Sequence, residues 1–172
     1  MKIKSEGAAL AAKEDVAGAD IAVYAAATLS LVAALIHLWV APEHFLHWWG
    51  YGVFFAVVAL SQGLFSLFIL RWPESALIPL AGIWGNLVVI SLYVISRTWG
   101  MPYGPGWGAP FNPDVAHVED PELLGMSATA AEVAIVILLV ALLGGARRRW
   151  TVNALLSLGV LLWALRLTGI LP

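Results

Sequence analysis

The chain has 172 residues, of which 61% are hydrophobic and only 12% are charged, and its mean hydropathy is +0.87. A soluble globular protein of this length needs more polar side chains to cover its surface, so the composition excludes that class and predicts a protein embedded in lipid. The net charge of −2 gives no basis for nucleic acid as a partner, and the absence of cysteine excludes disulfides, thiolate metal ligands and cysteine nucleophiles.

The first twenty residues are polar and mixed in charge. They lack the short apolar core and the small-residue cleavage site that follow the basic start of a removed signal peptide. We therefore expect residues 1–20 to be a frayed or amphipathic tail, followed by a first span that is retained as an anchor.

Five apolar stretches follow, each about 20 residues long, the length of helix that crosses the ~30 Å hydrocarbon core of a bilayer. None alternates apolar and polar residues with the period of a strand. The sequence predicts an all-α polytopic membrane protein with one five-helix transmembrane domain over residues 21–172. Its spans are expected at 21–40, 51–70, 77–96, 127–146 and 151–170.

Short turns separate most of these spans. Pro42 and Pro73 each suit the first turn of a following helix, where the missing N–H is no loss. The segment 97–126 differs, because its many prolines and glycines exclude a regular helix, and we expect it to be the one long loop. Its aromatic residues favour an ordered cap over the bundle, but an inert surface loop remains an equal alternative.

The positions of the basic residues predict the orientation. With five spans, the N-terminal tail and the turns near 71–76 and 147–149 lie on the same side. That side holds seven of the nine basic residues: Lys2, Lys4, Lys13, Arg71, Arg147, Arg148 and Arg149. By the positive-inside rule we expect it to be cytoplasmic, which places the N-terminus in the cytoplasm and both the long loop and the C-terminus outside the plasma membrane.

The stretch "HLWVAPEHFLHWWGYG", residues 37 to 52, holds three of the four histidines. In the predicted topology all four lie on the extracytoplasmic side, and histidine is the commonest metal ligand. His37 and His44 would be the core ligands, with the remaining ligands drawn from His47, Glu43 and His117. Imidazole and carboxylate without thiolate fit copper, zinc or iron, and the outer location favours copper.

A second interpretation of the same stretch needs no metal. Five tryptophans are expected at this boundary, where an apolar ring with a polar N–H is stable: Trp39, Trp48, Trp49, Trp99 and Trp107. The histidine spacing matches no established metal motif. An interfacial belt of aromatic residues therefore competes with the metal site.

A few polar residues lie inside the predicted spans or near their ends: Gln62, Asn86, Arg97, Glu132 and Arg166. A carboxylate in hydrocarbon is costly unless it is paired or protonated, so we expect Glu132 to point inward and to pair with Arg97 or Arg166. Such a pair would be a structural clamp, with Gln62 and Asn86 as hydrogen-bonding residues between helices. A proton relay or a substrate pocket is the alternative.

The segments "HLWVAPEHFLHWWGYGVFF" and "GNLVVISLYVISRTWGMPYGP", with the later intramembrane glutamate, resemble a group of small multi-pass bacterial membrane proteins of uncharacterised function. The resemblance covers most of the chain and implies no mechanism. It draws attention to His37, Glu43, His44, Asn86, Arg97, Gly104, Pro105 and Glu132. No phosphate-binding glycine loop, nucleophile elbow or HExxH helix is present, so no catalytic residue is predicted.

Three functions follow from these observations. The leading hypothesis is a membrane protein that binds a metal or redox cofactor through histidines at its extracytoplasmic face. The second is a carrier of a small solute, a proton or a lipid, which would use Glu132 and Asn86. The third is a structural subunit of a larger membrane complex, in contact with other membrane subunits or with further copies of itself as well as with the lipid bilayer.

Overall fold

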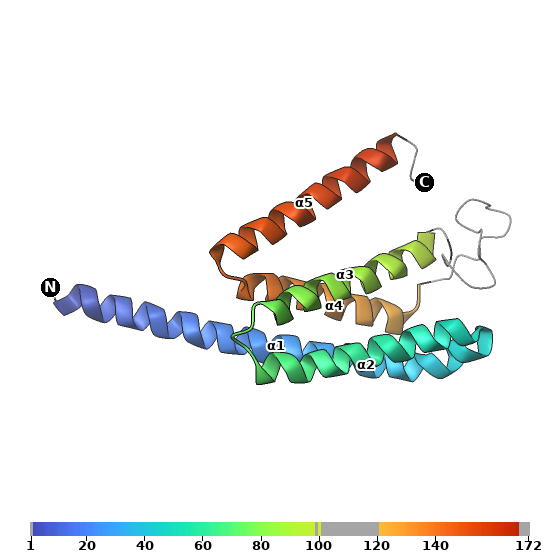
Figure 1. Ribbon diagram of the computed structural model, residues 1–172, viewed down its shortest axis with the longest axis horizontal. Helices are drawn as coiled ribbons and strands as arrows, with labels where there is room; N and C mark the ends of the chain where they lie inside the picture. The colour runs from blue at the N-terminus through green and yellow to red at the C-terminus, as the bar shows by residue number, and fades with distance from the viewer. Residues whose placement is uncertain (1, 99, 101–120, 169–172) are drawn as a thin grey trace.

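The structure is a computed structural model that describes residues 2–98, 100 and 121–168, with side chains from residue 17 onward. These residues form helices α1 (Lys2–His47), α2 (Trp49–Arg71), α3 (Leu77–Thr98), α4 (Leu123–Leu142) and α5 (Gly145–Leu167) (Figure 1). All five are long and apolar enough to cross a membrane, α1 by its part from Ala17 onward. The chain is therefore a multi-pass α-helical protein that contacts the lipid bilayer.

The first four helices form an antiparallel bundle. Helix α1 packs along α2 on one side and α4 on the other, and α4 also packs against α3, whereas α2 and α3 have few contacts with each other. Helix α5 leaves the end of α4 and diverges from the bundle (Figure 1). The bundle is consequently closed on the α1 and α4 side and more open between α2 and α3.

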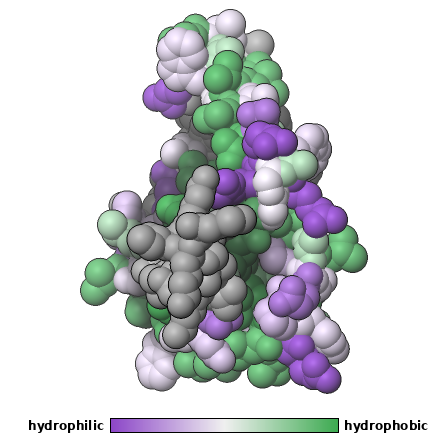
Figure 2. Space-filling view, turned by 90° about the vertical axis from the view of Figure 1, so that its left-hand side faces the viewer, coloured by the Kyte–Doolittle hydropathy of each residue, from purple (hydrophilic) through white to green (hydrophobic). Residues whose placement is uncertain are grey.

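The two ends of the bundle differ in their side chains. At the end that we call the histidine end, α1 finishes with His44 and His47, and α4 begins. At the opposite end, the arginine end, α2 finishes at Arg71 and α5 begins beside three exposed arginines. Figure 2 looks at the arginine end and shows hydrophilic residues gathered around it.

The apolar core fills the half of the bundle near the arginine end. Its central members include Ile69 of α2, Ile83 of α3 and Leu139 of α4, and small residues of α1 let that helix pack closely against them. Gly82 is required for this packing, because a Cβ built there would lie 2.5 Å from the Phe65 ring and 2.6 Å from Leu139.

Several sequence-based boundaries were wrong, and the two prolines explain part of the error. Pro42 does not begin a helix, because α1 continues through it to His47. Membrane helices tolerate proline when neighbouring groups satisfy the freed backbone. Pro73 lies in the turn before α3 and not in its first turn. Residues 2–20, expected to be a frayed or amphipathic tail, are helical and form the first part of α1.

The last two helices also begin earlier than expected. Helix α4 starts at Leu123, inside the segment assigned to the long loop, and α5 starts at Gly145. The arginines 147–149 therefore form the first turns of α5 and not a connecting turn. Residues 99 and 101–120, the greater part of the expected loop, lie outside the described residues.

Candidate functional site

Each of the four bundle helices contributes one buried polar side chain to a common cluster. These side chains are His37 of α1, Gln62 of α2, Asn86 of α3 and Glu132 of α4, and each residue is 1–6% exposed. Polar groups are costly in an apolar interior unless they are bonded, so the cluster exists only because the helices bring the four side chains together.

Glu132 is the centre of this cluster. Its Oε1 lies 2.9 Å from Nε2 of His37 and accepts a hydrogen bond of 2.9 Å from Nε2 of Gln62. The same Gln62 nitrogen is 3.4 Å from Oδ1 of Asn86, whose Nδ2 donates to the carbonyl of Gly82 at 2.8 Å. The amide of Gln62 therefore links the polar residues of α3 and α4, while His37 joins them to α1.

The expected partners of Glu132 were wrong, since the carboxylate bonds to His37 and Gln62 and not to Arg97 or Arg166. Helix geometry explains this result. Glu132 is nine residues into α4, about 13 Å from its start, whereas Arg97 is one residue from the end of α3. The Arg97 guanidinium lies 5.1 Å over the Tyr93 ring, and Arg166 is exposed on the divergent α5.

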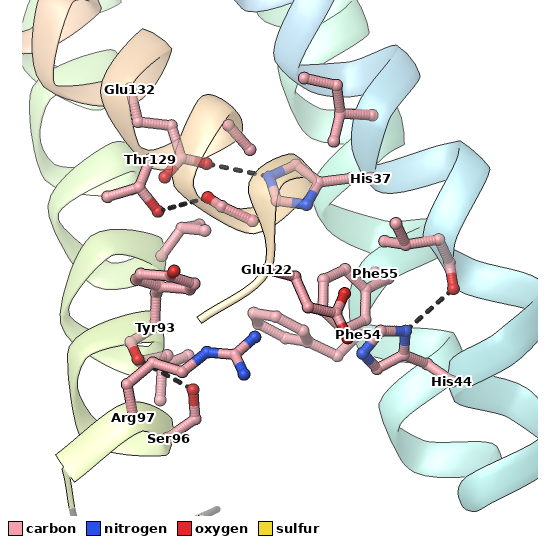
Figure 3. A pocket seen from close by; sticks show the side chains of 16 residues that line it. His37, His44, Phe54, Phe55, Tyr93, Ser96, Arg97, Glu122, Thr129 and Glu132 are labelled. Atoms are coloured by element: carbon pink, nitrogen blue, oxygen red, sulfur yellow. Dashed lines mark hydrogen bonds and ion pairs between the residues drawn. The ribbon is translucent and has the colours of Figure 1, made fainter. Parts of the chain in front are cut away.

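A cavity of about 70 Å³ lies between the cluster and the histidine end. His37 and Glu132 line it on the inner side, and Tyr93, Arg97 and Glu122 line it nearer the end of the bundle (Figure 3). This volume has room for several water molecules. The cavity therefore connects the buried pair with the region beside the histidine end.

Two polar atoms of the cluster are buried without a hydrogen-bond partner among the described residues: Nδ1 of His37 and Oε1 of Gln62. Buried polar atoms nearly always have a partner, which in many sites is water. The ring of His37 lies on the cavity wall (Figure 3). Water or a small polar solute in the cavity would supply the missing bond to Nδ1.

The other histidines of α1 proposed as metal ligands lie nearer the histidine end than His37 does. His44 also lines the cavity, and its ring packs against Phe55 at a centroid distance of 4.0 Å, while its Nδ1 lies 2.9 Å from the carbonyl of Val40. His47 is exposed and its Nδ1 lies 3.0 Å from the carbonyl of Glu43. Each of these rings is thus held by a carbonyl of its own helix.

The continuity of α1 accounts for this separation. Seven residues separate His37 and His44, which places them on the same face of a helix, whereas His47 is turned about 80° from His37 at 100° per residue. Within the described ranges no group of three histidine, aspartate or glutamate side chains could hold a metal. His117 lies outside the described residues.

Sequence reasoning missed the pairing of His37 with Glu132. His37 lies ten residues before the end of α1 and Glu132 nine residues after the start of α4, so both are at about the same depth. This match in depth can be recognised from the sequence only if the ends of α1 and α4 are predicted correctly. Because Pro42 was assigned to a new helix, His37 was placed only one turn from the surface, and the match in depth was lost.

No protein-family model matches the sequence, and no curated protein and no solved structure is similar to it.

Proposed function

We propose that the protein is a proton carrier of the membrane, in which the pair of His37 and Glu132 takes up and releases a proton through the cavity at the histidine end. One observation carries this proposal. Glu132 is 1% exposed and bonded to an imidazole that lines a cavity and whose other nitrogen has no partner among the described residues. An ionisable residue inside a membrane protein is a functional candidate by default.

A purely structural clamp fits these contacts less well. Replacing a buried ionic pair by well-packed apolar side chains is often neutral or stabilising, so stability alone is a weak reason to keep one. A clamp is also expected to satisfy its polar atoms, whereas Nδ1 of His37 and Oε1 of Gln62 lack a partner in the described part of the chain. An open cavity beside the pair supports exchange with solvent.

The two nitrogens of imidazole allow His37 to pass a proton from the cavity to Glu132. A proton that binds Nδ1 from the cavity converts the ring to imidazolium, and the proton on Nε2 can then transfer along the hydrogen bond to Oε1 of Glu132, which lies 2.9 Å from Nε2. The ring is left neutral with its proton on Nδ1. Gln62 donates to the same carboxylate oxygen and holds it in position.

The packing on the other side of the pair determines the end of the bundle from which a proton can reach it. Toward the arginine end the bundle is filled by the apolar core that contains Ile83, Ile135 and Leu139. In this conformation the pair is therefore reached from the histidine end. Release at the opposite end requires the helices to separate, and the sparse packing of α2 on α3 is the place where we expect that movement.

The direction of transport depends on the orientation in the membrane. The positive-inside rule places the arginine end and the N-terminus in the cytoplasm, and the histidine end and the C-terminus outside a plasma membrane. The resemblance to bacterial membrane proteins fits such a location. A C-terminal reporter that is active only outside the cytoplasm is the expected result, and activity only in the cytoplasm would contradict this orientation.

Binding of copper, zinc or iron remains a separate prediction, and it needs a ligand beyond those that the structure brings together. His37 and His44 share the cavity wall, and the third ligand would have to come from outside the described residues, with His117 as the candidate. Metal analysis of metal-replete purified protein tests this prediction. A stoichiometric metal lost in both His37→Ala and His44→Ala would support it.

Proton uptake by liposomes that contain the purified protein and an internal pH-sensitive dye tests the carrier function. We expect uptake above that of empty liposomes for the wild type, and loss of the excess in Glu132→Gln, which preserves the size of the side chain. Ser91→Ala, on the exposed face of α3, is the control and should transport normally. Wild-type flux equal to that of empty liposomes, or unchanged flux in Glu132→Gln, would refute the proposal.

A further inference from the structure

Helix α5 packs on the rest of the molecule less than any other span. Only 6% of the residues in its apolar window are buried, compared with 22–39% in the other four helices, and Thr151 is the one buried residue that the described part of α5 contains. Figure 1 shows α5 diverging from α4 along its length. Most of its surface is therefore available to lipid or to another helix.

The outward face of α5 carries residues that are unusual for contact with lipid. Thr151, Ala154 and Leu155 are buried or half-buried and share one face, the face toward the bundle. At 100° per residue, the roughly opposite face presents Asn153 and Ser157, followed by Val160 and Ala164, all exposed. Small and polar residues on one face of a membrane helix are typical of an interface with another helix.

Asn153 makes this face more than a pattern of small residues. Its amide is exposed in the first half of an apolar helix and forms no hydrogen bond within the described residues. An amide is unfavourable in hydrocarbon unless it has a hydrogen-bond partner. The outward face of α5 is therefore suited to a polar partner from another helix.

A groove between α2 and α3 offers such a partner. It has a volume of about 560 Å³ and is mostly apolar, but Ser61, Gln62 and Asn86 also line it. Ser61 is exposed there, and Oε1 of Gln62 is buried without a partner among the described residues. Gly85 leaves the groove open, since a Cβ built there would meet no atom within 4 Å.

The polar residues of the two surfaces lie at the same depth. Asn153 is eight residues from the start of α5, about 12 Å from the arginine end, and Gln62 is nine residues before the end of α2, about 13 Å from that end. Ser61 is one residue further. Helices inserted in the same orientation would therefore bring these groups together without sliding along the membrane normal.

We propose that α5 of one copy of this chain packs into the α2–α3 groove of another copy, with the Asn153 amide bonded to the polar side chains of Ser61 and Gln62. The α5 helix of the same chain cannot reach this groove. Leu142 and Gly145 are separated by three residue steps, at most about 11 Å, whereas the groove lies beyond α3, roughly two interaxial distances from α4. The protein is then an oligomer held by exchanged α5 contacts.

The chain contains no cysteine, so single cysteines can be introduced without removing native ones. Two differently tagged chains, one with Ser61→Cys and the other with Ser157→Cys, are co-expressed and oxidised in the membrane. We expect a cross-linked dimer that carries both tags. Gly63→Cys replaces Ser61→Cys in the control, because Gly63 is on α2 near Ser61 but does not line the groove, and it should give no mixed dimer.

A blocking substitution provides a second, independent measurement. Gly85→Leu should fill the groove and convert the oligomer to a monomer in mild detergent. Gly63→Leu should leave the oligomer unchanged, because Gly63 does not line the groove. Both positions have open space at Cβ, so neither substitution creates a clash at Cβ within the chain. Cross-linking to another protein but not to this chain would refute the proposal. A wild-type protein that is monomeric in both detergent and membranes would also refute the proposal, and lipid would then occupy the groove.

Discussion

The imidazole of His37 and the carboxylate of Glu132 are 95 residues apart in the sequence and 2.9 Å apart in the structure, on helices that run in opposite directions. Their bond joins α1 to α4 at the level where the apolar core ends and the cavity begins. The pair therefore contributes to stability and is also placed where a proton could reach it. Substitutions can separate these two roles.

Removing one member of the pair should destabilise the bundle more than removing both. Glu132→Leu leaves His37 and the Gln62 amide without their acceptor, and we expect a loss of about 3–5 kcal/mol in the free energy of unfolding. His37→Leu together with Glu132→Leu should recover part of that loss, because two apolar side chains replace the pair. Thermal unfolding in detergent measures both, and equal losses would contradict this account.

The number and type of the helices were predictable from the sequence, because a helix that crosses a bilayer requires a continuous apolar stretch of about 20 residues. The inward-facing polar residues were predictable for a related reason. Glu132 is costly in lipid, and the structure buries it. The burial of Glu132 can be predicted from its residue type alone, without knowledge of which residue it contacts.

The identity of its partner could not be predicted in the same way. In a membrane helix both the lipid-facing and the buried faces are apolar, so the sequence contains little information on how each helix is rotated. The depth of a residue depends on the helix ends, and the continuation of α1 through Pro42 moved His37 away from the surface. Arginine was expected as the partner because its charge complements a carboxylate. The partner is histidine because His37 lies at the same depth in the bundle as Glu132.

Gln62→Leu should weaken the cluster without removing the proton-binding pair. The substitution removes the 2.9 Å bond to Glu132 and the contact with Asn86, and we expect a loss of about 1–3 kcal/mol in the free energy of unfolding. Ser66→Ala on the same helix is the control, since Ser66 is also buried but has no bond to Glu132 or Asn86 among the described residues. A loss as large in the control would show that α2 is sensitive to any change.

Gly125→Ala should narrow the cavity. A Cβ at this position would lie 3.0 Å from Cε2 of Tyr93 and 3.7 Å from Nη2 of Arg97, so the Tyr93 ring must move slightly. We expect slower proton uptake in liposomes with a change in stability below about 1 kcal/mol, because the helical preference of alanine offsets the crowding. Uptake at the wild-type rate would indicate that protons reach Glu132 by another route.

Two glycines of α3, three residues apart, should respond differently to substitution by alanine. At Gly82 the new Cβ would lie 2.5 Å from the Phe65 ring and 2.6 Å from Leu139 in the core, so Gly82→Ala should cost about 1–3 kcal/mol. At Gly85 no atom lies within 4 Å of the new Cβ, and Gly85→Ala should be neutral or stabilise α3 by about 0.5–1 kcal/mol. The free energies of unfolding of the two variants in the same detergent test the packing of α3. If Gly82→Ala proved as stable as Gly85→Ala, the close contact of α3 with Phe65 and Leu139 would be refuted.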